Sequence, residues 1–151
     1  MDLHIVDARS VMPSCLDVLE SSASEEGIKN VSRLIQEWNL GQTLFDGKGE
    51  CLVLAQASGL TVAIGGLLEC KAVPDALRVS RFYVLPDWRM KGIATAIANH
   101  LLSDSREFTE VVTCNAQASE NAAPFWESLG FISTEIPGIT HILRVNSEPN
   151  S

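Results

Sequence analysis

The residues best suited to chemistry lie between 89 and 95, in the segment Arg-Met-Lys-Gly-Ile-Ala-Thr. An apolar, strand-like run from Leu77 to Leu85 precedes this segment, and apolar residues at helical spacing follow it. The first N–H groups of a helix have no partner inside the helix and carry the positive end of its dipole, so they can bind a phosphate group. Gly92 leaves room for a ligand to approach the backbone. Arg89 and Lys91 would oppose the dipole of an unliganded helix, which favours a bound anion. The segment therefore predicts a phosphate-binding turn.

Hydrophobic periodicity predicts the elements that position this turn. Strands are expected at 3–6, 51–57, 60–71, 77–85, 110–115, 131–134 and 141–145. Apolar residues at steps of three and four predict helices from about 10 to 19, 28 to 38, 93 to 102 and 121 to 129. The polar stretch 21–27 ends in glycine and predicts a break between the first two helices. Asn121 is the expected N-cap of the last helix, with Pro124 in its first turn, and Gly130 ends it.

The order of these elements, β-α-α-β-β-β-α-β-α-β-β, predicts an α+β fold. The strand, helix and strand from 77 to 115 form a crossover, which joins parallel strands and is right-handed. We expect a mixed, mostly antiparallel central sheet of six or seven strands with helices on both faces. Gly65 and Gly66 inside one strand predict a bulge or a close backbone approach. A single domain is expected over residues 1–146, followed by a loose polar tail at 147–151.

Composition excludes several classes of protein. The net charge of −8 argues against a nucleic-acid partner, since phosphate backbones require basic surfaces, and it weakly favours a cationic acceptor. The N-terminus lacks the pattern of a signal peptide, and no apolar run approaches the ~20 residues of a membrane helix. A cytoplasmic location without membrane contact is therefore expected. The four cysteines have no metal-binding spacing, so we expect reduced thiols and no metal site.

The segment 77–102 resembles the coenzyme-A-binding core of the GCN5-related N-acetyltransferases (GNAT family). In that family a strand ending in an apolar-x-Pro pattern is followed by R/Q-x-x-G-x-G/A and a helix. The positions that match this motif are Phe82, Tyr83, Val84, Pro86, Arg89, Gly92 and Ala94. The segment 123–131, Ala-Pro-Phe-Trp-Glu-Ser-Leu-Gly-Phe, is similar to the family's C-terminal motif. With the matching element order, the resemblance covers nearly the whole chain and implies the acyl-CoA N-acyltransferase fold.

The resemblance implies an enzyme that transfers an acetyl group from acetyl-CoA to a primary amine of a small molecule or peptide. The amine would attack directly in a ternary complex, and coenzyme A would be the only cofactor. The backbone around Met90–Thr95 would bind the pyrophosphate, and the pantetheine arm would lie along Phe82–Val84 as an added strand. Asn121 and Phe125 would lie near the arm and the thiol. The implied cofactor-binding residues are Phe82, Tyr83, Val84, Arg89, Met90, Lys91, Gly92, Ile93, Ala94, Thr95, Asn121 and Phe125.

The sequence identifies no catalytic residue. Many members of the family use a tyrosine of the late helix to protonate the leaving thiolate, and the aligned position here is Trp126, whose indole cannot serve as such an acid. Tyr83, Glu69 and His141 are the candidates for proton transfer, and water is an equal alternative. A backbone N–H near Val84 or Leu85 is a candidate oxyanion donor.

Two other functions are compatible with the sequence. Because of Trp126, a catalytically silent protein that binds coenzyme A as a sensor or interaction module is the main alternative. A different phosphate-binding protein, such as a nucleotide binder, is disfavoured because neither GxxxxGK[ST] nor a complete GxGxxG is present. Edge strands near the C-terminus are compatible with a homodimer.

Overall fold

The computed structural model describes residues 3–7, 16–42, 45–117 and 120–145. They form a seven-stranded mixed sheet in the order β1-β2-β3-β4-β5-β7-β6. The strands are β1 Leu3–Asp7, β2 Cys51–Ala57, β3 Leu60–Glu69, β4 Leu77–Val84, β5 Val111–Cys114, β6 Ile132–Ser133 and β7 His141–Arg144. Neighbouring strands are antiparallel except for β4 and β5. The predicted fold class is therefore confirmed.

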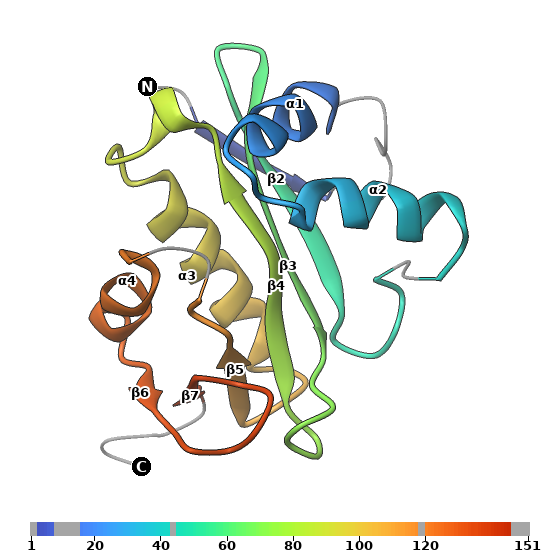
Figure 1. The fold of residues 1–151 in the computed structure, drawn as a ribbon. Helices are drawn as coiled ribbons and strands as arrows, with labels where there is room; N and C mark the ends of the chain where they lie inside the picture. The colour runs from blue at the N-terminus through green and yellow to red at the C-terminus, as the bar shows by residue number, and fades with distance from the viewer. Residues whose placement is uncertain (1–2, 8–15, 43–44, 118–119, 146–151) are drawn as a thin grey trace.

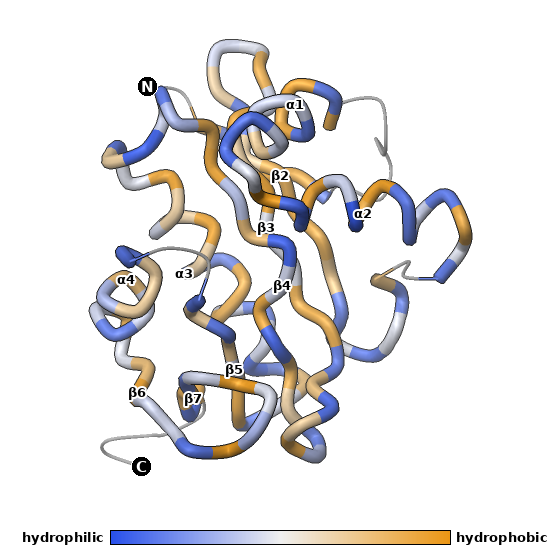
Figure 2. The backbone as a smooth tube through the Cα atoms, viewed as in Figure 1, coloured by the Kyte–Doolittle hydropathy of each residue, from blue (hydrophilic) through white to orange (hydrophobic). Residues whose placement is uncertain are grey.

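Within the described residues four α-helices cover the sheet, and Figure 1 shows α1 and α2 on the opposite side from α3 and α4. Their bounds are α1 Asp17–Glu25, α2 Asn30–Asn39, α3 Ile93–Ser105 and α4 Ala122–Ser128. One apolar core lies beneath α1 and α2, and a larger one lies between the sheet and α3 with α4. The central strands are apolar along most of their length (Figure 2), because both of their faces are covered. None of the helices in the described residues is long and apolar enough to cross a membrane.

The first two helices differ from the sequence prediction. Ser21–Glu25 continue α1, where a break was predicted, because Leu19 and Ala23 lie one turn apart and are both buried. The chain leaves the helix at Gly27, whose φ of 77° is in the left-handed region that glycine tolerates. The predicted start near Ser10 and the tail at 147–151 lie outside the described residues. Further along the chain, α3 continues past the predicted end at Leu102 to Ser105, whose hydroxyl donates to the Leu102 carbonyl.

A bulge interrupts the pairing of β3 with β4. Ile64 pairs with Tyr83 and Gly66 pairs with Ser80, so two residues of β4 oppose the single residue Gly65. A Cβ atom on Gly65 would lie 2.8 Å from Ile97 Cγ2 of α3 and 2.9 Å from Phe82 Cδ2, so a larger residue would have to displace these side chains. The irregularity predicted at Gly65 and Gly66 is confirmed.

The parallel pair β4 and β5 separates along its length. Only Leu77 with Val112 and Arg78 with Thr113 are in register. Beyond them β4 continues to Val84 without β5 beside it. Backbone groups on this side of β4 are therefore not paired to a neighbouring strand, which is the geometry that an extended ligand can complete.

Candidate active site

The separation of β4 and β5 opens a cleft with a volume of about 440 Å³. Its walls come from the second half of β4, the end of β5, the connection between α1 and α2, and the start of α4. The lining residues are Glu26, Ile28, Asn30, Val79, Ser80, Arg81, Phe82, Tyr83, Val84, Arg89, Ala94, Cys114, Asn115, Asn121, Ala122, Phe125 and Trp126. The cleft is thus built by segments that are far apart in the sequence.

Many of the residues predicted to bind the cofactor line this cleft. They are Phe82, Tyr83, Val84, Arg89, Ala94, Asn121 and Phe125. The other predicted residues, 90–93 and Thr95, lie in the turn before α3 or in its first turn and are not part of the lining. Ile93 is buried in the core, so only its backbone can face a ligand.

The turn ahead of α3 has the shape expected of an anion-binding site. A short 3-10 helix, Pro86–Trp88, leads into it, and Met90 and Gly92 have φ values of 62° and 83°. Among the described residues no side chain caps the helix, so its first N–H groups are not bound by a cap. A Cβ atom on Gly92 would meet no atom within 4 Å. The open, uncapped turn therefore fits a pyrophosphate.

Arg89 is bound within the protein. Its Nη2 and Nη1 atoms donate to the two carboxylate oxygens of Glu26 at 2.6 and 3.0 Å, and its Nε donates to the Val84 carbonyl at 3.0 Å. The Tyr83 hydroxyl donates to Glu26 at 2.5 Å and contacts the Ser22 hydroxyl at 2.8 Å. These contacts join the end of α1 to the end of β4. Sequence reasoning missed the role of Glu26, which is indistinguishable from other loop acids without the fold.

This network shifts the pKa values of its members. The hydrogen bond from Arg89, then that from Tyr83, lowers the pKa of the Glu26 carboxyl, so the group is ionised and weakly basic. The hydrogen bond to Glu26 raises the pKa of Arg89. Desolvation, followed by the bond to Glu26, raises the pKa of Tyr83. Tyr83 therefore keeps its proton, which it donates to Glu26.

Trp126 lies at the centre of an aromatic cluster on the α4 side of the cleft. Its ring is edge-on to Phe82 at 5.2 Å, to Phe125 at 4.9 Å and to Phe131 at 5.3 Å between centroids. Such pairs add to the stabilisation from burial. The residue at the family's tyrosine position thus forms part of the cleft wall and supplies no acid.

The structure separates the three candidates for proton transfer. Tyr83 lines the cleft, although its hydroxyl is bonded to Glu26 and Ser22. Glu69 lines a different cavity. His141 lines neither: it is buried, and its ring nitrogens lie 2.8 Å from Thr140 Oγ1 and 2.8 Å from Glu127 Oε2. The Leu85 N–H donates to the Val62 carbonyl, so it is not a free oxyanion donor.

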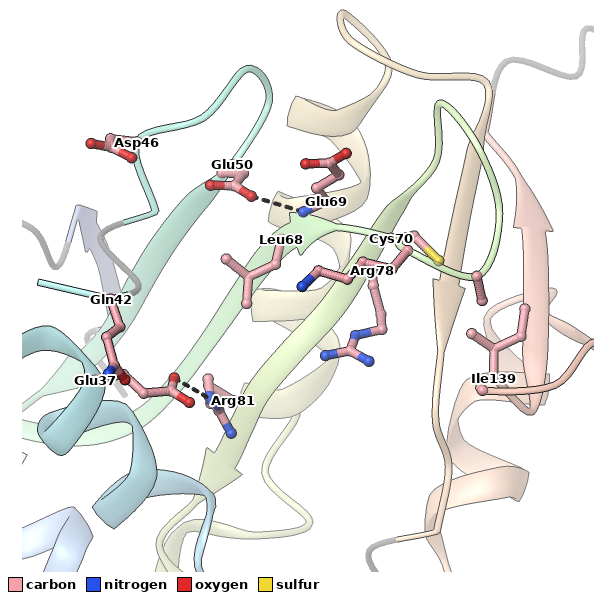
Figure 3. Close-up of a pocket in the computed structure, with 13 residues that line it drawn as sticks. Glu37, Gln42, Asp46, Glu50, Leu68, Glu69, Cys70, Arg78, Arg81 and Ile139 are labelled. Atoms are coloured by element: carbon pink, nitrogen blue, oxygen red, sulfur yellow. Dashed lines mark hydrogen bonds and ion pairs between the residues drawn. The ribbon is translucent and has the colours of Figure 1, made fainter.

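A second cavity, of about 650 Å³, lies on the α2 side of β4 (Figure 3). Its lining residues are Glu37, Gln42, Asp46, Glu50, Leu68, Glu69, Cys70, Lys71, Ala72, Arg78, Arg81, Gly138 and Ile139. Arg81, at the bulge of β4, lines both this cavity and the cleft. The residue therefore connects the two spaces.

Comparison with known proteins identifies the family. Residues 19–145 match the acetyltransferase (GNAT) domain. A solved structure from Exiguobacterium sp. 255-15, described as an acetyltransferase, is 25% identical, with a TM-score of 0.84 over 95% of this chain and 94% of that chain. A comparison with curated proteins finds no significant match.

Two more distant solved structures share the fold. The ribosomal-protein-S18-alanine N-acetyltransferase of Escherichia coli is 16% identical, with a TM-score of 0.71 over 99% of this chain and 97% of that chain. An acetyltransferase structure from Salmonella typhimurium with its cofactor acetyl-CoA is 15% identical, with a TM-score of 0.68 over 97% of this chain and 96% of that chain.

The fold and the cleft thus define an acyltransferase-type domain. The chain belongs to the GNAT acetyltransferase family, because the family match covers most of its length. The resemblance seen in the sequence is confirmed, and the protein is an acetyltransferase of this family.

Proposed function

We propose that the protein transfers the acetyl group of acetyl-CoA to a primary amine of a small molecule or peptide, with both substrates bound together. The observation that carries this proposal is the cleft between β4 and β5, which runs along a strand edge without a neighbouring strand and includes Ala94 of the first turn of α3. A pantetheine arm can pair with that edge, while a pyrophosphate lies at the uncapped start of α3. The bound donor supplies a thioester carbonyl to the cleft.

The reaction neither gains nor loses protons overall. The amine nitrogen attacks the carbonyl carbon, the N–C bond forms and the C–S bond breaks. Sulfur leaves with the bonding electron pair and gains one proton, while the amine nitrogen loses one. Among the described lining residues Glu26 is the only carboxylate, and its low pKa makes it a poor base. The amine therefore loses its proton to water in this proposal.

Cys114 supports direct attack over a covalent acetyl-enzyme. It is the only cysteine among the described residues that line the cleft, and burial raises its pKa to about 12. A thiol with that pKa stays protonated near neutral pH, and the thiolate is the nucleophilic form. The residue is therefore a poor carrier for the acetyl group.

The test measures thiol release from acetyl-CoA across a panel of primary amines, with wild type and Cys114→Ser. Both proteins should release thiol at rates within about threefold of each other if no covalent step exists. Loss of activity in Cys114→Ser, with acetylated wild-type protein in a mass spectrum, would refute direct attack. Tight binding of acetyl-CoA without thiol release for any amine would instead support the silent coenzyme-A-binding module.

A further inference from the structure

Two buried side-chain atoms among the described residues lack a hydrogen-bond partner, and both belong to residues that line the cleft. They are Asn30 Oδ1 and Arg81 Nε. Buried polar atoms are normally bonded, because an unsatisfied group loses its hydration without compensation. One of these atoms is an acceptor and the other is a donor. A ligand that satisfies both must offer an N–H or O–H group and an acceptor oxygen.

The Asn30 amide is held in one orientation. Its Nδ2 donates to the Phe82 carbonyl at 3.1 Å, which leaves Oδ1 as the unbonded end. This contact places the side chain, at the first residue of α2, against the bulge of β4. The Oδ1 atom can accept an N–H of the amine that is to be acetylated.

The guanidinium groups of Arg81 and Arg78 line the second cavity, on the other side of the bulge. Arg81 Nη2 pairs with Glu37 at 2.7 Å, and Arg81 Nε is buried without a hydrogen-bond partner. Within the described part of the chain, Arg78 has one hydrogen bond, from Nε to Ser80 Oγ at a long 3.4 Å, and no ion pair. Figure 3 shows both guanidinium groups reaching the second cavity from β4. The Arg78 guanidinium, which forms no ion pair with any described residue, is suited to a carboxylate, which it can bind with two parallel hydrogen bonds.

Four acidic residues line the second cavity together with Arg78: Glu37, Asp46, Glu50 and Glu69. Glu37 is paired with Arg81, and Glu50 accepts the backbone N–H groups of Gly47 and Glu69 at 3.0 and 2.9 Å. None of the four forms an ion pair with Arg78 within the described residues. With Lys71 and Arg81, the lining carries three cations against four carboxylates, so the preference for an anionic group rests on the Arg78 guanidinium and not on the net charge of the cavity.

We propose that the acceptor is an amino-acid-like molecule, in which a primary amine and a carboxylate are separated by a few bonds. The amine binds Asn30 Oδ1 in the cleft, and the carboxylate binds Arg81 Nε and the Arg78 guanidinium across the bulge. This inference rests on the proposed amine acetylation. The transfer is the same: the N–C bond forms, the C–S bond breaks, and the proton lost by the amine balances the proton gained by the leaving sulfur. The carboxylate is unchanged.

The experiment compares matched acceptors with the wild-type protein. Each amino acid of a panel is assayed beside its carboxamide and its decarboxylated amine, by thiol release from acetyl-CoA. The carboxylate form should have a kcat/KM at least about tenfold higher, since a charge-assisted bond to arginine distinguishes it. Equal kcat/KM for acids and amides would overturn the inference and leave amine acetylation intact. A panel without any thiol release would overturn both.

Variants separate the two ends of the acceptor. Arg78→Gln should lower kcat/KM for the best amino acid about tenfold or more through KM, and leave the carboxamide within about twofold. Arg33→Gln removes the same charge from α2 outside both cavities and should change neither. Asn30→Ala should weaken acids and amides alike. Arg78→Lys should retain part of the preference for acids over amides. Thermal unfolding checks that each variant is folded. An Arg78→Gln protein with undiminished preference for acids would refute the assignment.

Discussion

Gly92 offers a test of the predicted pyrophosphate site in which charge can be separated from backbone strain. Any L-residue at a φ of 83° costs about 1–2 kcal/mol of stability, while the open space around the position excludes a steric clash. Gly92→Gln and Gly92→Glu carry that cost equally, so the difference between their affinities for acetyl-CoA reports the added negative charge. At about 5 Å and an effective dielectric of about 20 to 40, one carboxylate and one phosphate charge repel by about 2 to 3 kcal/mol.

This repulsion corresponds to a Kd for acetyl-CoA about 30- to 150-fold weaker in Gly92→Glu than in Gly92→Gln. Titration calorimetry at two salt concentrations measures it, and the ratio should shrink at high salt because the turn is exposed. Equal melting temperatures of the two variants provide the control. Affinities within about threefold of each other would show that the pyrophosphate does not bind at the start of α3.

Three further substitutions test the surroundings of the cleft. Tyr83→Phe should lower the unfolding free energy by about 1 kcal/mol in urea denaturation, because the hydroxyl is bonded to Glu26. The variant should keep kcat within about threefold of wild type, and a fall in kcat of about 100-fold would make Tyr83 the acid. Glu26→Gln should be less stable than wild type at pH 7. The difference in unfolding free energy should close as the pH falls below 4.5, because Arg89 lowers the folded-state pKa of Glu26 and protonation then removes the charge. A pH-independent difference in denaturation curves would contradict this. Gly65→Ala should lose about 1–3 kcal/mol by overpacking against Ile97, and an unchanged melting temperature would be the opposite outcome.

The sequence predicted the sheet better than the first helices. Continuous apolar runs identified β2, β3 and β4 to within two residues, because a strand covered on both faces leaves few polar positions. Residues 21–27 were predicted as a break, because this stretch is polar and ends in glycine. Burial of Ala23 against the sheet overrides that local preference, and such a tertiary contact is not visible in the sequence.

The candidate site likewise combines features that the sequence predicts with features that only the structure shows. The turn at Gly92 was predictable because glycine, charge and helix start are local features. The pair of Glu26 with Arg89 joins residues 63 positions apart in the chain, so no spacing rule could reveal it. The unpaired atoms of Asn30 and Arg81 depend on the packing of α2 against β4 and could be found only in the structure.

The extra residue in β4 also sets which side chains reach which side of the sheet. Before it, the even-numbered Arg78 and Ser80 lie on the α2 side; after it, the odd-numbered Arg81 and Tyr83 do, and Phe82 joins the core beneath α3. A regular strand of the same sequence, without the bulge, would alternate strictly from Ser80 onward. Arg81 and Tyr83 would then point into the apolar core beneath α3, and the Phe82 ring would point to the α2 side. Deleting one residue at the bulge, by contrast, would restore one-to-one pairing with β3 and leave Tyr83 on its present side. The bulge thus lets two successive polar positions, Ser80 and Arg81, face the same side of the sheet.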